Sequence, residues 1–138
     1  MKRKSLIVAA VASMLAPTAA VAHEWVVIGN DEHGWRWQMD KKADRLAGDR
    51  EDHVYVWARS DLPPGSTKSY SPSNWYFKIS CRHGTIRSLR MIAFDKASGR
   101  QLEERSSPDD LGGKDMPEPK SGSIRETIVG NMCYNPDF

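Results

Sequence analysis

The chain has 138 residues, a formal net charge of +2 and only two cysteines. Three of its 20 basic residues fall within the first 22 positions, and the other 116 residues carry 17 basic and 18 acidic side chains. Because this larger part is slightly acidic, its composition argues against nucleic-acid binding. Its length suits a single domain with one modest core.

Residues 1–22 have the pattern of a secretory signal peptide. A basic N-terminus precedes an apolar stretch that is short for a membrane span. Small residues at Ala20 and Ala22 fit cleavage before His23. An uncleaved anchor is the alternative. We expect an exported domain of residues 23–138 that has no further membrane span.

Alternation of apolar and polar residues predicts six β-strands. The expected strands are 24–29, 35–40, 53–59, 74–81, 85–95 and 100–105. The first two are expected to form a hairpin, and imperfect alternation in the fifth indicates a bulge or burial on both faces.

Three segments between these strands are expected to be loops. The charged residues 41–52 predict a loop, or a loop with one helical turn. Proline, serine and glycine make 60–73 a long surface loop, and 106–122 should lack regular structure for the same reason.

One helix is expected near the C-terminus. Ser123 and Glu126 have the spacing of a capping box, in which two side chains satisfy backbone donors of the first turn. Ile124, Ile128 and Met132 then recur at intervals of four and form one apolar stripe. The fold class is therefore α+β: an antiparallel curved sheet of about six strands with one helix packed on one face.

The two cysteines are expected to tie this helix to the sheet. Cys81 shares a strand face with Phe77 and Ile79, and Cys133 lies beside the apolar stripe of the helix. An exported chain meets an oxidising compartment, where such a pair persists as a disulfide. A redox or nucleophilic role is the alternative, but no C-x-x-C pair is present.

The aromatic residues of the central strands indicate a binding surface. Tyr55 and Trp57 alternate with valines, and Tyr76 is expected to lie on the same side of the sheet. One helix can cover only one face, so this aromatic set either meets a partner or packs under loops.

Charged residues nearby are less informative. Arg87 and Arg90 are candidate partner-binding residues, although they would lie on opposite faces of an unbulged strand. A solvated strand edge explains them equally well. Asp109 and Asp110 are read as solvated loop charge.

The sequence gives little support for a metal-binding or catalytic site. An N-terminal His23 offers an amine and an imidazole to copper, whereas the simpler interpretation is a frayed end with exposed histidines. No catalytic or phosphate-binding motif is present. We expect a protein that is not an enzyme and has no cofactor.

Several segments, taken in order, resemble the surface-adhesin protein E family of bacterial exported domains. They are Trp25 in "EWVVIG", Asp40 in "WQMD", Trp57 in "VYVWAR", Cys81 in "FKISC", and the serine-capped helix that ends at Cys133. The resemblance implies the same sheet, helix and disulfide. It also implies attachment to a protein partner such as a host matrix or plasma protein, homodimer formation, and a place in the periplasm, on the cell surface or outside a Gram-negative bacterium. A periplasmic carrier of a small ligand or copper is the alternative.

Overall fold

The computed structural model describes residues 23–45, 53–62, 65 and 72–138. The signal-peptide prediction for 1–22 lies outside these residues. The described elements are strands β1 (Trp25–Asn30), β2 (Arg36–Asp40), β3 (Asp44–Arg45), β4 (His53–Asp61), β5 (Ser73–Ser80), β6 (Thr85–Phe94) and β7 (Gln101–Ser106), the 3-10 turn η1 (Gly113–Asp115) and helix α1 (Ile124–Tyr134).

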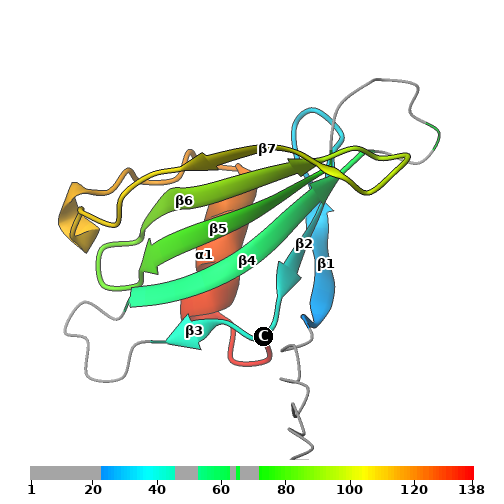
Figure 1. Cartoon of the computed structure of the whole chain (residues 1–138). Coiled ribbons are helices and arrows are strands. Elements are labelled where there is room, and N and C mark those ends of the chain that lie inside the picture. The colour runs from blue at the N-terminus through cyan, green and yellow to red at the C-terminus, as the bar shows by residue number, and fades with distance from the viewer. Residues whose placement is uncertain (1–22, 46–52, 63–64, 66–71) are drawn as a thin grey trace, which may run out of the picture.

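The strands form one antiparallel sheet in the order β1-β2-β4-β5-β6-β7, and the two-residue β3 also pairs with β4 (Figure 1). Neighbours in the sheet are neighbours along the chain except where β3 intervenes, which is why the pairing is antiparallel throughout. The α+β prediction, with its six strands and first hairpin, is confirmed.

Strand β4 shows how the sheet separates its two faces. Val54, Val56 and Ala58 are buried, whereas Tyr55 and Trp57 between them are half-buried. Side chains of a strand alternate between faces, so β4 contributes to the core on one side and to a second surface on the other.

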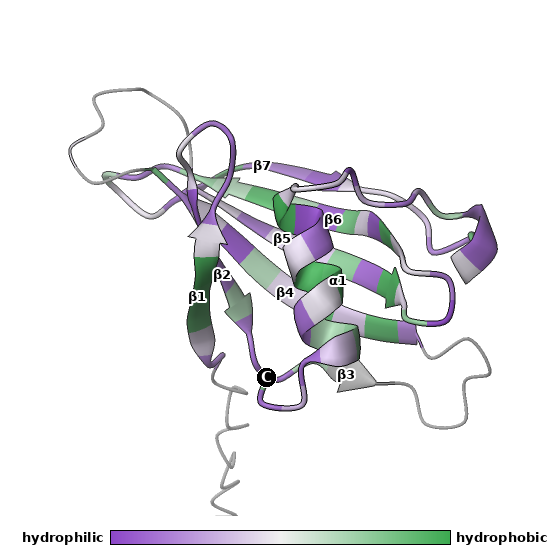
Figure 2. Cartoon of the chain, turned by 180° about the vertical axis from the view of Figure 1, so that it is seen from behind, coloured by the Kyte–Doolittle hydropathy of each residue, from purple (hydrophilic) through white to green (hydrophobic). Residues whose placement is uncertain are grey.

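Helix α1 covers the first of these faces (Figure 2). Its N-cap is Ser123, whose hydroxyl accepts a hydrogen bond from the Glu126 amide at 3.3 Å. Ile128 and Met132 are buried against the sheet. The predicted start and apolar stripe of the helix are therefore confirmed.

Cys81 and Cys133 form the predicted disulfide, with Cα atoms 5.3 Å apart. The bridge joins the end of β5 to the last turn of α1 across 52 positions of sequence. By restricting the unfolded chain, a loop of this length stabilises the fold by about 4 kcal/mol in the chain-entropy model.

Three predictions about the connections need correction. Residues 41–52 were expected to form no strand, but Asp44 and Arg45 pair with Val54 and Tyr55. Residues 106–122 were expected to lack regular structure, but they contain η1, which packs against β5 and β6. Ser60, Asp61 and Ser73 were expected to lie in the 60–73 loop, but they belong to strands β4 and β5. Most of the rest of that loop lies outside the described residues, as do residues 46–52 of the connection for which a loop or a loop with one helical turn was expected. No helix in the described part of the chain is long and apolar enough to cross a bilayer.

Candidate binding face

The sheet face opposite α1 carries the five residues proposed from the sequence for partner binding. Trp57 pairs with Tyr76, which pairs in turn with Arg90 on β6. One step along the sheet, Tyr55 is opposite Lys78, and Lys78 is opposite Arg87. Directly paired residues share a face, so all five predicted residues lie on one surface. We call this surface the helix-free face.

A bulge explains why Arg87 and Arg90 share that face. Their separation of three predicts opposite faces, which is wrong here because the register shifts between Tyr76 and Phe77. Tyr76 pairs with Arg90 and Phe77 with Ser88, so β6 contains one extra residue. The predicted irregularity of this strand is confirmed, and it gathers both guanidinium groups on one side.

The aromatic side chains of the helix-free face lie in contact with one another. The ring centroids of Trp57 and Tyr76 are 4.8 Å apart, and those of Tyr55 and Tyr76 are 5.9 Å apart. His23 continues this aromatic row, 6.4 Å from Trp57 and 5.1 Å from Trp25. Ring pairs at these distances attract each other beyond simple burial.

Cationic side chains lie over these rings. The Arg59 guanidinium is 4.5 Å from the ring centroid of Trp25, and that of Arg90 is 5.9 Å from Trp57. Cations over ring faces are held partly by the ring quadrupole. Sequence reasoning missed Trp25 and Arg59 as members of this surface, although the alternation in β4 places Arg59 on the side of Trp57.

A loop after β7 reaches one corner of the helix-free face. The Asp109 carboxylate accepts hydrogen bonds from Tyr55 Oη at 2.7 Å and Lys78 Nζ at 2.6 Å. Beside it, Asp110 accepts from Arg87 at 2.7 Å. Both aspartates were interpreted as solvated charge, and this is corrected: each forms an ion pair with the sheet.

These contacts hold the Asp109 carboxylate ionised. Burial raises the pKa of Asp109, but hydrogen bonds from Lys78 and Tyr55 outweigh that effect and hold the pKa below its usual value. The side chain of Lys78 is only 7% exposed, so it needs this carboxylate to balance its charge.

His23 is tied down rather than frayed, which corrects the simpler interpretation of this residue. Its Nδ1 lies 2.5 Å from the Asp40 carboxylate, which also accepts the backbone amides of Glu24 and Lys42. Burial raises the pKa of Asp40, but these hydrogen bonds outweigh it and lower the pKa. Within the described residues no group of three histidine, cysteine or acidic side chains could hold a metal ion.

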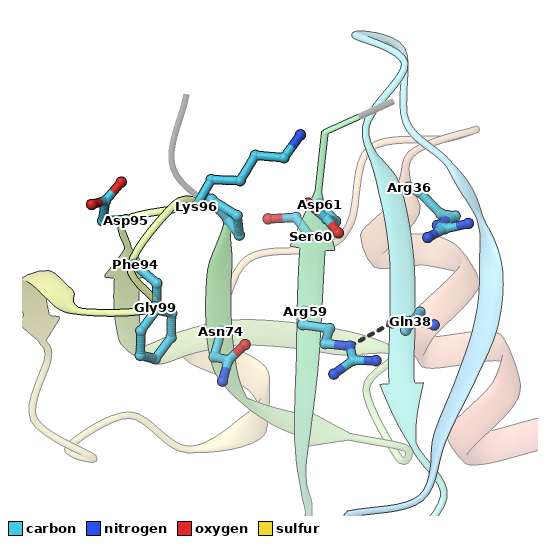
Figure 3. A pocket seen from close by; sticks show the side chains of 11 residues that line it. Arg36, Gln38, Arg59, Ser60, Asp61, Asn74, Phe94, Asp95, Lys96 and Gly99 are labelled. Atoms are coloured by element: carbon cyan, nitrogen blue, oxygen red, sulfur yellow. Dashed lines mark hydrogen bonds between the residues drawn. The ribbon is translucent and has the colours of Figure 1, made fainter. Parts of the chain in front are cut away.

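An open pocket of about 450 Å³ lies at one end of the same face (Figure 3). Its polar lining comes from four neighbouring strands and the turn after β6. The residues that line it include Arg36, Gln38, Arg59, Asp61, Asn74, Phe94, Asp95 and Lys96. Sequence reasoning did not find this pocket, because its residues are spread over 60 positions of the chain and meet only in the folded sheet.

Comparisons of the chain with protein-family models, with curated proteins and with solved structures gave no match.

Proposed function

We propose that this chain is an exported, non-enzymatic binding protein whose helix-free face docks a protein partner. One observation carries the proposal: Tyr55, Trp57 and Tyr76 form a contacting, half-buried row on the sheet face that α1 does not cover. Aromatic residues beside arginine are the side chains that contribute most to protein–protein interfaces. The resemblance to surface-adhesin protein E agrees with this function and suggests a host matrix or plasma protein as the partner.

The charges near the aromatic row favour a protein over a polyanion. Lys78, Arg87 and Arg90 each pair with a carboxylate of the chain itself. A nucleic acid or a sulfated glycan would have to displace these carboxylates, whereas a protein surface can pack on the rings and leave the ion pairs in place.

Export is part of the proposal. The signal-like pattern of residues 1–22 supports it, and the Cys81–Cys133 disulfide is typical of an oxidising compartment. Fractionation of cells into cytoplasm, periplasm, outer membrane and medium tests this part. Recovery of the intact 138-residue chain in the cytoplasm alone would contradict it.

The binding experiment compares two aromatic substitutions. Oxidised protein of residues 23–138 is immobilised and exposed to a panel of purified matrix and plasma proteins, and self-association is measured by sedimentation. Trp57→Ser should weaken the partner interaction or dimer formation at least tenfold. Tyr134→Ser is the matched control, because Tyr134 is 71% exposed on the helix.

The outcomes separate a binding face from a covered surface. Retained binding by a folded Trp57→Ser protein would move the binding surface elsewhere. Equal losses from both substitutions would indicate a general effect on the fold.

A further inference from the structure

One row of side chains crosses the whole helix-free face and lies alongside the row of Trp57, Tyr76 and Arg90. Its members are directly paired from strand to strand: Val27, Gln38, Arg59, Asn74, Ile92 and Glu104. From Val27 to Ile92 the order is apolar, amide, cation, amide, apolar. Figure 3 shows the central Gln38, Arg59 and Asn74 next to one another in the pocket.

The cations of this pocket differ from those under the Asp109 loop. Among the described residues, Arg36, Arg59 and Lys96 form no ion pair with a carboxylate, whereas Lys78 and Arg87 both do. Arg36 and Lys96 are exposed to solvent. The pocket therefore holds positive charge that the described part of the chain does not neutralise by direct contact.

Arg59 is oriented to accept a ligand. Its Nε donates to the Gln38 side-chain oxygen and its planar group lies over Trp25. Within the described residues its two Nη groups make no hydrogen bond, so their four donors can reach an incoming oxygen. The guanidinium is thus fixed in position while its terminal donors stay available.

The two carboxylates of the pocket are already engaged. Asp61 accepts the amide of Leu62, and Asp95 accepts the hydroxyl of Ser98. Three cations and two carboxylates leave a net charge of +1. This balance favours a singly charged group over a phosphate dianion or a polyanionic chain, which the two aspartates would repel.

We infer that this pocket binds the carboxylate of an acidic side chain in an extended segment of the protein partner. The inference rests on the proposed function and names the chemistry of its ligand. Arg59 and Lys96 neutralise the carboxylate, the amides of Gln38 and Asn74 meet the peptide backbone, and Val27 and Ile92 contact apolar side chains on either side.

The chain carries its own example of this recognition. The neighbouring Asp109 and Asp110 of one loop bind Lys78, Arg87 and Tyr55 on the same face. Consecutive acidic residues of an irregular segment can therefore lie across these strands and pair with their cations.

The spacing of the row predicts the ligand's sequence pattern. Neighbouring strands lie about 4.8 Å apart, so Val27 and Ile92 are each about 10 Å from Arg59. A segment in the extended polyproline II conformation rises about 3.1 Å per residue and has three residues per turn, so it covers that distance in three residues and presents the same side to the sheet. The expected segment has an acidic residue with apolar residues three positions before and after it.

The probe is a blocked peptide, LSSESSL, compared with LSSQSSL, which differs only in lacking the charge. Binding to oxidised protein is followed by NMR, using the side-chain signals of Arg59, Gln38 and Asn74. The glutamate peptide should bind about tenfold more tightly than the glutamine peptide and should shift these signals. Free glutarate and inorganic phosphate are titrated in parallel.

Paired substitutions locate the site without disturbing the Arg59–Trp25 contact. The double change Arg36→Gln and Lys96→Gln alters two exposed side chains and should lower the affinity for the glutamate peptide about tenfold. Arg105→Gln is the control, because Arg105 is an exposed cation opposite Met91 on the other face of the sheet.

Equal affinity for the two peptides, or an equal loss with Arg105→Gln, would overturn the inference. Tighter binding of glutarate or phosphate than of the glutamate peptide would show that the pocket binds a free anion, and it would overturn the inference that the ligand is a peptide segment. If a partner needs Trp57 but tolerates loss of Arg36 and Lys96, the proposed function stands and the pocket inference fails. If the peptide binds as expected but no partner needs Trp57, the pocket binds the acidic segment and the proposed role of the aromatic row fails.

Discussion

The carboxylate of Asp109 lies 2.6 Å from the ammonium of Lys78, which precedes it by 31 positions. Lys78 points from β5 onto the helix-free face, and the carbonyl of Leu111 accepts a second hydrogen bond from it at 2.9 Å. A nearly buried ammonium is costly without such partners. The loop after β7 therefore supplies the carboxylate and the carbonyl that stabilise the charge of Lys78 on the sheet.

Replacing Asp109 should destabilise the fold and weaken its dependence on pH. Asp109→Asn should cost about 1 kcal/mol, since the carboxylate is 41% exposed and solvent screens the ion pair. The folded pKa of Asp109 is lowered, so its contribution is present above the unfolded pKa of about 3.9 and is lost as the pH falls through the lower folded value. Urea unfolding between pH 2 and pH 6 measures both effects.

Asp110→Asn provides the matched comparison, because Asp110 is 60% exposed and binds the partly exposed Arg87. It should change the free energy of unfolding less than Asp109→Asn does. A larger effect from Asp110 would show that the loop is held mainly through Arg87.

Reduction of the disulfide should lower stability by about 4 kcal/mol. The oxidised, denatured protein should contain no reactive thiol, because Cys81 and Cys133 are bonded to each other. Urea unfolding with and without reductant measures the loss. A double serine variant that matches the oxidised protein would contradict the expectation.

The helix cap can be tested with two nearby serines. Ser123→Ala removes the oxygen that accepts from Glu126 and should cost about 1 kcal/mol. Ser121→Ala removes an exposed hydroxyl outside the helix and should cost much less. Equal shifts of the urea midpoint would place the functional cap elsewhere.

Gly113 and Gly130 should respond in opposite ways to alanine. A Cβ at Gly113 would lie 2.3 Å from Ser80 Oγ and 2.6 Å from its Cβ, so Gly113→Ala should push η1 away from β5 and destabilise the protein. A Cβ at Gly130 meets no atom within 4 Å apart from its chain neighbours and the backbone of its own helix. Gly130→Ala, inside α1, should stabilise by up to about 1 kcal/mol. Thermal unfolding distinguishes the two.

Trp57 should contribute less to stability than Phe77, although the two belong to neighbouring strands. Trp57 is half-buried on the helix-free face, whereas Phe77 is 1% exposed beneath α1. We expect Trp57→Ser to cost about 1–2 kcal/mol and Phe77→Ala about 3–5 kcal/mol. Similar losses in a monomeric sample would identify Trp57 as a core residue and would favour the loops as the binding surface.

Local patterns were enough to predict the six longer strands, the helix and the two faces. The alternation of Val54 to Trp57 depends only on the pleat of one strand, and the Ser123–Glu126 cap spans one helical turn. The disulfide was predicted by combining the strand pattern, which places Cys81 on the core face, with the helix pattern, which places Cys133 beside the apolar stripe.

The rest depends on contacts between distant residues. The shared face of Arg87 and Arg90 required the position of a one-residue bulge. The path of the loop that brings Asp109 to Lys78 has no local signal at all, since a proline- and glycine-rich segment does not specify its direction. Arg59, by contrast, could have been placed from the alternation of β4.

The strict alternation of β4 also bears on how this protein can evolve. Val54, Val56 and Ala58 maintain the core, while Tyr55, Trp57 and Arg59 in between make up the outer surface. Because the two sets occupy separate faces, changes in the second set leave the packing under α1 intact. Descendants of this chain could thus change the chemistry of the outer surface while keeping the same scaffold.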